Sequence, residues 1–292
     1  MAMFGKYGRW AFTSLGAASA VVVVAKCASR LDDSNNESSG NRVHIRPPDY
    51  APTTKWDTNW DRSDPRFLKH KVWSDESKKS TNDDSNIKFP TARRNIFLIR
   101  HGQYNQKGDD DDCHTLTKIG EEQALLLGKK MAASGIKFTS ILSSGMTRAI
   151  QTSELMLKEM KNEYPGLILE KKDPLLNEGP PCIPEPPYRN KELWDPDFNE
   201  FYAEGARIEA AFRRYFHRAD LDQKDDSFEI IVCHANVIRY FTMRAMQFPP
   251  EAWLRISLDH TSITRISLLP NGDVILRGLG DSGHLPPDKT TA

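Results

Sequence analysis

The chain has 292 residues, and its 40 Lys and Arg balance its 40 Asp and Glu, so that the formal net charge is zero. This balance argues against a nucleic-acid-binding domain, which usually carries a basic excess. Hydrophobic residues make up only 38% of the chain, which indicates that part of it lies outside a packed core, and the length excludes both a disulfide miniprotein and a polytopic membrane protein.

The N-terminal residues 1–31 are basic and contain no acid. Between Arg9 and Lys26 the residues are all uncharged, and as a helix they would extend roughly 24 Å, against about 30 Å for the bilayer core. This pattern predicts an N-terminal membrane helix with snorkelling basic flanks, and it is also typical of a mitochondrial import sequence. The alternatives are a secretory signal cleaved after residues 18–20 and a buried core helix.

Residues 32–92 are rich in polar residues and Pro and show no sustained apolar period, which predicts a flexible linker. Two tryptophans in this solvated segment favour a pocket on a partner surface, because buried aromatic anchors contribute strongly to interfaces. We therefore predict an oligomerisation motif at 56–61, made of Trp56, Asp57, Asn59, Trp60 and Asp61. The alternative is that the segment folds back onto its own domain.

From Arg93 onward, short apolar runs alternate with helical patterns. The runs predict strands at 96–99, 140–142, 167–169 and 229–233 and a terminal hairpin of 263–269 and 274–279. Helices are predicted at 117–134 with Thr117 as N-cap, at 148–160, at 205–218 and after residue 233. This alternation predicts an α/β fold, a three-layer sandwich with a mostly parallel central sheet, preceded by the membrane helix and the flexible linker.

Histidines and arginines follow directly after several of these strands. Arg100 and His101 follow the first strand, Arg148 lies just beyond the second, and His234 closes a later one. Sheets of this type bind ligands beyond the carboxyl ends of their strands. A lone histidine at a strand end is more often structural, but several such residues at one edge favour a functional site.

These residue types suit phosphoryl transfer. Guanidinium groups bind phosphate oxygens in pairs and keep their charge, and a neutral imidazole attacks phosphorus to give a phosphohistidine. A second, cationic imidazole beside the same phosphate stabilises the transition state. The sequence has neither a Walker lysine loop nor a clustered acidic metal site, so it predicts chemistry without a metal or another cofactor.

The order of the motifs resembles that of the histidine phosphatase (phosphoglycerate mutase-like) superfamily. The motifs are Arg100-His101-Gly102 and the segments 116–124, 143–152, 176–179 and 232–236, which together cover roughly 93–280. Within that superfamily the chain is most similar to a branch of mitochondrial, membrane-anchored serine/threonine protein phosphatases. The motif at 56–61 and the segments 205–212, 234–250 and 279–288 carry this closer similarity.

The resemblance implies roles for five residues. It makes His101 the nucleophile that becomes phosphorylated, with Arg100 and Arg148 binding the phosphate. It places His234 on the opposite side of the phosphate and makes Glu178 the general acid that protonates the leaving oxygen and then activates water. The alternatives are that Arg148 caps its helix and that Glu178, in a Pro-rich loop, is merely solvated.

The chain also departs from the pattern of small-molecule mutases. Those enzymes usually carry Glu followed by Ser or Thr where this chain has Gln103-Tyr104, and Gly is common where it has Ala235. The acidic loop 109–112 would repel a highly anionic sugar phosphate, although it also serves to keep a loop in solvent. These features favour hydrolysis of a phosphate carried by a protein.

The four cysteines, Cys27, Cys113, Cys182 and Cys233, are widely spaced and form no Cys-x-x-Cys pair, which argues against a zinc ribbon or a thioredoxin-like site. Reduced thiols are the simpler interpretation, and a disulfide pair is the alternative.

The sequence thus predicts four parts: a targeting and transmembrane segment (1–31), the linker (32–92), a catalytic domain (93–280) and a C-terminal tail (281–292).

The expected function is that of a metal-independent serine/threonine protein phosphatase, with protein phosphohistidine as a further substrate implied by the resemblance. We expect it in a mitochondrial membrane, the outer one by resemblance and the inner one as the alternative. The expected partners are phosphoproteins, the membrane and further copies of the chain. The competing functions are a catalytically weak scaffold that recruits partners at that membrane and a small-molecule phosphatase or mutase.

Overall fold

The computed structural model describes residues 54–68, 88–190, 192 and 194–292, and all of them from Lys55 onward belong to one compact unit that ends at Ala292. The predicted N-terminal membrane helix and most of the predicted linker lie outside the described residues. Within the described part of the chain, no helix is long and apolar enough to cross a membrane.

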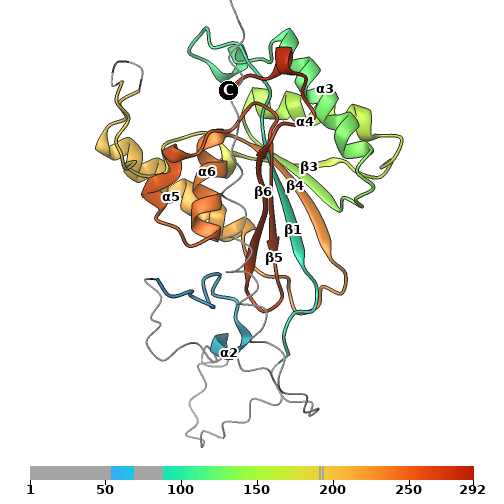
Figure 1. Ribbon diagram of the computed structural model, residues 1–292, viewed down its shortest axis with the longest axis vertical. Coiled ribbons are helices and arrows are strands. Elements are labelled where there is room, and N and C mark those ends of the chain that lie inside the picture. The colour runs from blue at the N-terminus through green and yellow to red at the C-terminus, as the bar shows by residue number, and fades with distance from the viewer. Residues whose placement is uncertain (1–53, 69–87, 191, 193) are drawn as a thin grey trace, which may run out of the picture. The chain divides into compact units, whose positions relative to one another are not determined.

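A six-stranded mixed sheet forms the centre of this unit, with the strand order β3-β2-β4-β1-β5-β6 (Figure 1). Its parallel part consists of β1 (Arg94–Arg100), β2 (Ser140–Ser144), β3 (Leu169–Asp173) and β4 (Ser227–Cys233). The terminal hairpin, β5 (Ile263–Leu268) and β6 (Val274–Asp281), adds to β1 in the antiparallel sense. The α/β class predicted from the sequence is confirmed, with antiparallel strands along one edge.

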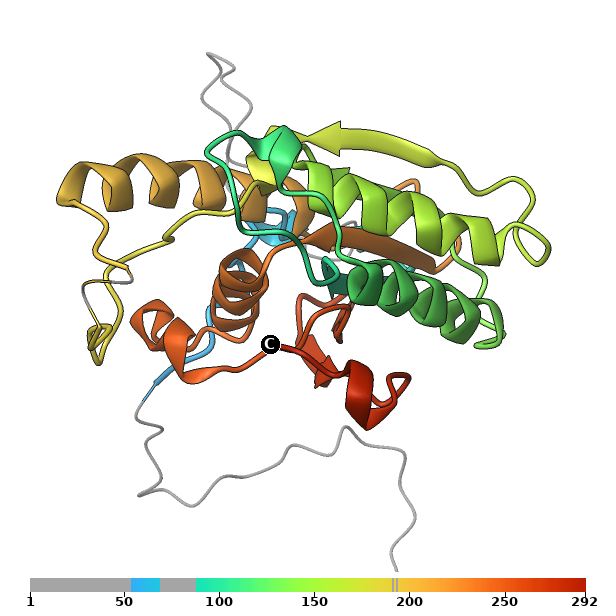
Figure 2. The same ribbon diagram turned by 90° about the horizontal axis from the view of Figure 1, so that it is seen from above.

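Helices cover both faces of this sheet (Figure 2). One face is covered by α3 (Lys118–Ala132) and α4 (Thr147–Met160), and the other by α5 (Phe198–Tyr215) and α6 (Ala235–Ala245). A short helix, α2 (Pro65–Leu68), and single 3-10 turns at 111–113, 174–176, 250–255 and 287–289 complete the secondary structure of the described residues.

The central strands supply two separate hydrophobic cores. In β1, Ile96 and Leu98 pack into the core under α5 and α6, whereas Phe97 and Ile99 pack into the core under α3 and α4. The residues of β4 alternate in the same way. Strands buried on both faces are nearly continuous apolar runs, and this is why β1 and β4 were recognisable in the sequence.

Two elements differ from the sequence prediction. The third strand spans Leu169–Asp173 rather than 167–169, because β3 is an edge strand whose first four residues alternate between half-buried and exposed and therefore form no apolar run. Helix α5 begins at Phe198 rather than at 205, since the side chain of Asp197 caps it by accepting from the backbone N–H of Glu200 at 2.8 Å.

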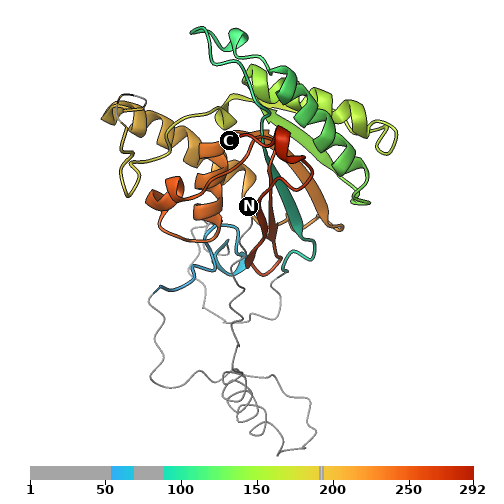
Figure 3. The ribbon, with the colours of Figure 1, turned by 45° about the horizontal axis from the view of Figure 1, so that its top comes forward.

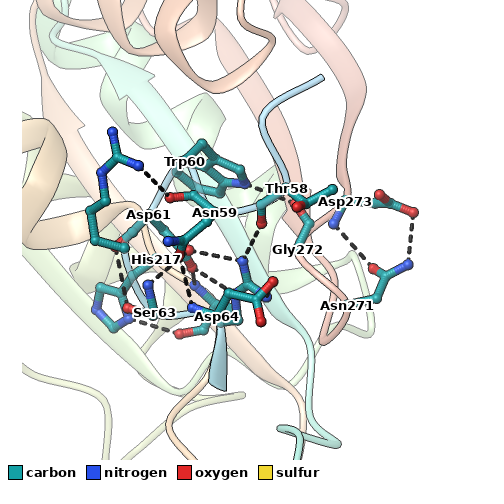
Figure 4. Close-up of polar contacts among 12 residues, drawn as sticks. Thr58, Asn59, Trp60, Asp61, Ser63, Asp64, His217, Asn271, Gly272 and Asp273 are labelled. Carbon is teal, nitrogen blue, oxygen red and sulfur yellow. Dashed lines mark hydrogen bonds and ion pairs between the residues drawn. The ribbon is translucent and has the colours of Figure 1, made fainter. Parts of the chain in front are cut away.

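Residues 54–68, which we call the strap, pack against this domain at the end of the sheet where β1 begins (Figure 4). The indole N–H of Trp60 donates to the carbonyl oxygen of Gly272, in the turn between β5 and β6, at 2.8 Å. The Trp60 ring is only 5% exposed, and its centroid lies 6.0 Å from that of Phe212 in α5. The strap therefore closes the end of one hydrophobic core.

A buried ion pair fixes the strap in place. Asp61 accepts hydrogen bonds from the backbone N–H of Arg218 at 2.8 Å and from its guanidinium at 2.9 Å. Arg218 also donates to the carbonyl oxygen of Thr58. Although burial opposes ionisation, the hydrogen bonds from Arg218 hold the pKa of Asp61 below its usual value.

The C-terminal residues return to the opposite end of the sheet, where β1 finishes (Figure 3). The carbonyl oxygen of Thr291 accepts from the backbone N–H of His260 at 2.8 Å. The side-chain amide of Gln123, in α3, donates to the carbonyl oxygen of Lys289 at 2.7 Å and to the hydroxyl of Thr291 at 2.9 Å. The tail thus packs beside the strand ends at which the sequence predicts a site.

Candidate active site

The carboxyl ends of the parallel strands bring the predicted histidines and arginines together. His101 follows β1, His234 follows β4, and their ring centroids lie 5.0 Å apart. Arg148, in the first turn of α4, donates from Nε to Nε2 of His101 at 3.3 Å. The electrostatic influence of Arg100, the last residue of β1, reaches both rings. These four residues therefore form one cluster, as the sequence predicts.

His101 is held as a neutral ring with one defined tautomer. Its Nδ1 lies 2.8 Å from the carbonyl oxygen of Gly102. Because a carbonyl oxygen only accepts, Nδ1 carries the hydrogen and Nε2 keeps its lone pair. Burial comes first, and repulsion from any proton on His234 and from the charges of Arg148 and Arg100 adds to it, so that the pKa of His101 lies well below its usual value. The ring is thus prepared to act as a nucleophile.

Two glycines allow the loop after His101 to lie against the start of α3. A Cβ on Gly120 would lie only 1.9 Å from the carbonyl oxygen of Gln103, and one on Gly102 only 2.7 Å from that of Gly120. Buried Gln123 then accepts from the backbone N–H of Gln103 at 2.8 Å. Larger residues would push the loop, and His101 with it, away from the helix.

The acidic loop contributes one residue to the site. Asp111 accepts from the backbone N–H and the hydroxyl of Thr147 at 2.7 and 2.9 Å, and its other oxygen lies 3.4 Å from Nη1 of Arg148. A cation in the first turn of a helix opposes the helix dipole, and the Asp111 carboxylate offsets this cost. The other three acids of the loop are exposed. Asp111 therefore caps α4 and orients its arginine, a role that the sequence left open.

Tyr104, a departure from the mutase pattern, forms one side of the cluster. Its ring centroid lies 5.1 Å from that of His101, with the rings edge to face. The guanidinium carbon of Arg148 lies 4.6 Å from the centroid of the Tyr104 ring, within the range of a cation–π contact. Tyr104 and Arg148 both line a cavity of about 280 Å³ that opens to solvent.

Glu178 lines the same cavity, on the loop that follows β3. Arg207 of α5 holds this loop by donating to the carbonyl oxygens of Leu175 at 2.7 Å and of Glu178 at 3.2 Å. Burial raises the pKa of Glu178, against the opposing effects of the Gly179 N–H and the nearby arginines. A carboxyl group that keeps its proton to higher pH is suited to act as an acid.

His234 is completely buried and has one hydrogen-bond partner among the described residues. Its Nε2 lies 2.7 Å from the hydroxyl oxygen of Ser144, whereas Nδ1 has no partner. Burial, followed by the charges of Arg148, Arg207 and Arg100, holds the pKa of His234 well below its usual value. The ring is therefore neutral until an anion enters the site.

Sequence reasoning missed three polar residues around this cluster. The ring of His260 lies 5.6 Å from that of His101, and it is buried, with Nδ1 2.9 Å from the hydroxyl of Thr291. His260 precedes an antiparallel strand, so the rule about carboxyl ends of parallel strands did not include it. Arg239 donates to the side chain of Asn236 at 3.0 Å. Asn236 and Arg239 lie three residues apart on one face of α6, the helix after His234, and this spacing was a signal that could have identified them.

The predicted oligomerisation motif lies apart from the site, at the other end of the sheet. Trp60 and Asp61 are buried against the chain's own domain, whereas Trp56 is 37% exposed. The backbone N–H of Asp57 donates to Gln247 at 2.8 Å, and the side chain of Asn59 accepts from the N–H of Asp64. These contacts match the alternative in which the segment folds back onto its own domain, and self-association remains a prediction.

In the described part of the chain, Cys113, Cys182 and Cys233 are free thiols, in line with the simpler interpretation of the sequence. Cys27 lies outside it. No group of three or more His, Cys, Asp or Glu residues that could hold a metal ion occurs among the described residues.

Comparisons with known proteins agree with this geometry. The profile described as "Histidine phosphatase superfamily (branch 1)" matches residues 96–178 and 184–278. The chain is similar to proteins named serine/threonine-protein phosphatase PGAM5, mitochondrial, from several animals. The mouse (Mus musculus) protein is 49% identical over 240 residues, which are 81% of this chain and 80% of that protein. The Caenorhabditis elegans protein is 48% identical over 253 residues (85% and 84%), and the Xenopus laevis protein is 42% identical over 285 residues (97% and 98%).

We expect Asp111→Ala to lower kcat/KM for a small aryl phosphate about tenfold, because Arg148 loses the partner that orients it. Loss of the helix cap should also lower the free energy of unfolding by about 1 kcal/mol. The matched control is Asp109→Ala, an exposed acid of the same loop, which should change neither quantity. Steady-state kinetics and denaturant titration measure both effects. Equal behaviour of the two variants would contradict the assigned role.

We also expect the stability of the fold to decline in mild acid because of His260. Burial, and then the charge of Arg100, lowers the pKa of His260 to about 4, whereas an unfolded histidine titrates near 6.5. Below pH 6.5 the unfolded chain therefore binds a proton that the folded chain does not, so stability is lost as the pH falls towards 4. The loss from this residue is on the order of 3 kcal/mol.

Denaturant unfolding of His260→Asn between pH 7 and 4 tests this expectation. The variant should show a shallower decline than the unmodified protein, because the substituted residue does not titrate. A constant offset between two parallel stability curves would show that His260 does not contribute to the pH dependence.

Proposed function

This chain belongs to the histidine phosphatase superfamily, and on that premise we propose that it is a serine/threonine protein phosphatase acting through a phosphohistidine intermediate. The observation that carries the proposal is the arrangement of His101, neutral and hydrogen-bonded through Nδ1 to a carbonyl oxygen, with Arg148 donating to its unprotonated Nε2 at 3.3 Å. The names of the relatives supply the substrate class, since these relatives are named as serine/threonine-protein phosphatases.

In the first step, Nε2 of His101 attacks phosphorus and the bond between phosphorus and the serine or threonine oxygen breaks. Glu178 donates its proton to that leaving oxygen, and its raised pKa lets it keep the proton to higher pH than an exposed glutamate does. Arg148 and Arg100 balance the charge of the phosphoryl oxygens. The anion also favours the charged form of His234, whose unpartnered Nδ1 then becomes a donor.

In the second step, a water molecule attacks the phosphohistidine, and the Glu178 carboxylate accepts a proton from it. The bond between phosphorus and Nε2 breaks, inorganic phosphate leaves, and His101 returns to the neutral ring with its hydrogen on Nδ1. We propose that both steps run without a metal ion or another cofactor, because the arginines and His234 supply the positive charge. Phosphohistidine in proteins is a further substrate that the same chemistry allows.

We further propose that the protein resides in mitochondria and that the predicted helix within residues 1–31 anchors it in a membrane there, the outer one in preference to the inner. The relatives are named as mitochondrial proteins, and the similarity to the Xenopus laevis relative extends over 97% of this chain. Two competing functions remain: a small-molecule phosphatase or mutase, which the acidic loop beside the cavity disfavours, and a scaffold, which would not need the ordered histidines and arginines.

The strap supports a proposal of self-association. Its buried contacts join a short segment to a receptor made of α5, the chain before β4 and the hairpin turn. Exchange of such a segment between copies creates an oligomer without any new kind of contact. Trp56, which is more exposed than Trp60, leaves additional apolar surface for a second copy.

Phosphate release tests the catalytic proposal. We expect the protein to hydrolyse a phosphoserine peptide faster than a bisphosphoglycerate, with no loss of rate in a metal chelator. His101→Ala should reduce the rate by on the order of 10³-fold or more, because removing the nucleophile disables the whole unit. Glu178→Gln should slow the phosphopeptide more than an aryl phosphate, whose leaving group needs less protonation.

Three results would overturn these assignments. A His101→Ala protein that keeps more than a few per cent of the rate would exclude His101 as nucleophile. An equal loss on both substrates would exclude Glu178 as the acid. A preference for bisphosphoglycerate would favour the small-molecule alternative.

Asp61→Ala tests two roles of the strap: its contribution to the stability of its own domain and its proposed exchange between copies. Because it removes the closer of the two carboxylates beside buried Arg218 and leaves only Asp64 at 3.8 Å, we expect it to lower the free energy of unfolding by about 3 kcal/mol. We also expect a lower mass in analytical ultracentrifugation across a dilution series, and Trp60→Ala should act in the same direction. Arg62→Ala is the control, because the ion pair of Arg62 with Asp57 is exposed and contributes at most about 1 kcal/mol. If both strap variants keep the mass of the unmodified protein at every concentration, the strap serves only its own chain.

A further inference from the structure

An apolar groove of about 230 Å³ adjoins the catalytic cavity. Its walls are mainly aromatic and proline side chains from the segment before α5 and from the first turns of that helix, among them Pro187, Tyr188, Trp194 and Phe198. Trp194 lines both this groove and the cavity that contains Glu178 and Arg148. The two hollows therefore adjoin at this indole ring.

The groove leaves large apolar side chains in water. Ile183 is 55% exposed, Tyr188 41% and Phe198 72%. Soluble proteins rarely leave apolar side chains gathered in one place unless the patch binds something. The groove accordingly has the composition of a binding surface rather than of a random set of surface residues.

The inner wall of the groove is rigid. The Trp194 ring packs edge to face against Tyr188, Phe201 and Trp253, with centroid distances of 5.7, 5.8 and 5.9 Å. Trp253 is fully buried, and its indole N–H donates to the carbonyl oxygen of Cys182 at 3.0 Å. Because this wall is already ordered, no conformational entropy is lost in ordering it when a ligand binds. Even one modest apolar contact therefore contributes to affinity.

Size and position together identify the occupant. Pockets for free small molecules usually measure about 300–1,000 Å³, which is larger than this groove. An extended peptide advances about 3.3 Å per residue, so it crosses the width of one indole in about two residues. A peptide whose phosphorylated residue lies in the catalytic cavity would therefore place a neighbouring side chain in the groove.

We propose that this groove binds an apolar side chain of the phosphoprotein substrate, located two or three residues from the phosphorylated residue. The inference rests on the proposed function and adds a sequence preference to it. Asp195 lines the groove and Glu200 the cavity, and these acids disfavour the anionic surface of a membrane as the occupant. The groove also shares the Trp194 wall with the cavity that the substrate itself must enter, which favours the substrate over a second copy of the chain.

The test compares three substrates on the full-length protein. One is an aryl phosphate, one a phosphoserine peptide with leucine two and three residues to either side, and one the same peptide with serine at those positions. We expect kcat/KM to be about tenfold higher for the leucine peptide than for the serine peptide, because an apolar contact in the groove is made or lost.

Groove variants supply the second arm. In Phe198→Ser and Tyr188→Ser, the ratio of kcat/KM for the leucine peptide to that for the aryl phosphate should fall about tenfold, and the preference for leucine should disappear. Leu221→Ser is the matched control, because Leu221 is 58% exposed but belongs to neither hollow, and it should keep both ratios.

The outcomes separate the two proposals. Hydrolysis of the aryl phosphate but of neither peptide would overturn the proposed function, and the groove inference with it. Equal kcat/KM for the two peptides would overturn only the groove inference. A groove variant that changes the mass of the protein but not its peptide preference would assign the groove to contacts between copies, and would equally overturn it.

Discussion

The unprotonated Nε2 of His101 depends on surroundings that keep the ring neutral. Burial penalises the charged ring, and the nearby guanidinium groups add repulsion of like charge. The carbonyl oxygen of Gly102 then selects the tautomer. Each of these partners is held by a different part of the fold: the end of β1, the first turn of α4, and the close approach of loop and α3 that Gly120 permits. The chemistry of the site is therefore a property of the whole sheet edge.

Much of this edge could be predicted from the sequence, and what could not has physical reasons. β1 and β4 are buried on both faces and are therefore continuous apolar runs, and Thr117 caps α3 through its own side chain. Both features can be recognised from residues that are adjacent in the sequence. The limits of β3 and the start of α5 depend on exposure and on a cap, which short apolar runs do not report. His260 lies before the antiparallel hairpin and Asp111 in the long loop between β1 and α3, and only the tertiary fold brings them to the site.

Helix α5 and Arg218, which lies just after it in the chain, hold irregular backbone at both ends of the sheet. Arg207 holds the loop that carries Glu178, while Arg218 holds the strap at the far end. In both cases a guanidinium group, which has several donors, binds carbonyl or carboxylate oxygens that the hydrogen bonds of helices and sheets leave unpaired. The sequence did not reveal this shared use of arginine, because it linked neither residue to the segment that it holds.

The separation of the two hydrophobic cores has a consequence for how such an enzyme diversifies. The face covered by α3 and α4 carries Arg148 and the contacts that hold the loop of His101, whereas Glu178, the apolar groove and the strap belong to the side of α5 and α6. Substitutions that remodel the second side need not repack the first, since the sheet insulates one core from the other. The surfaces of the groove and the strap can thus change without displacing His101 or Arg148, whereas a change that moves the Glu178 loop reaches the catalytic cavity itself.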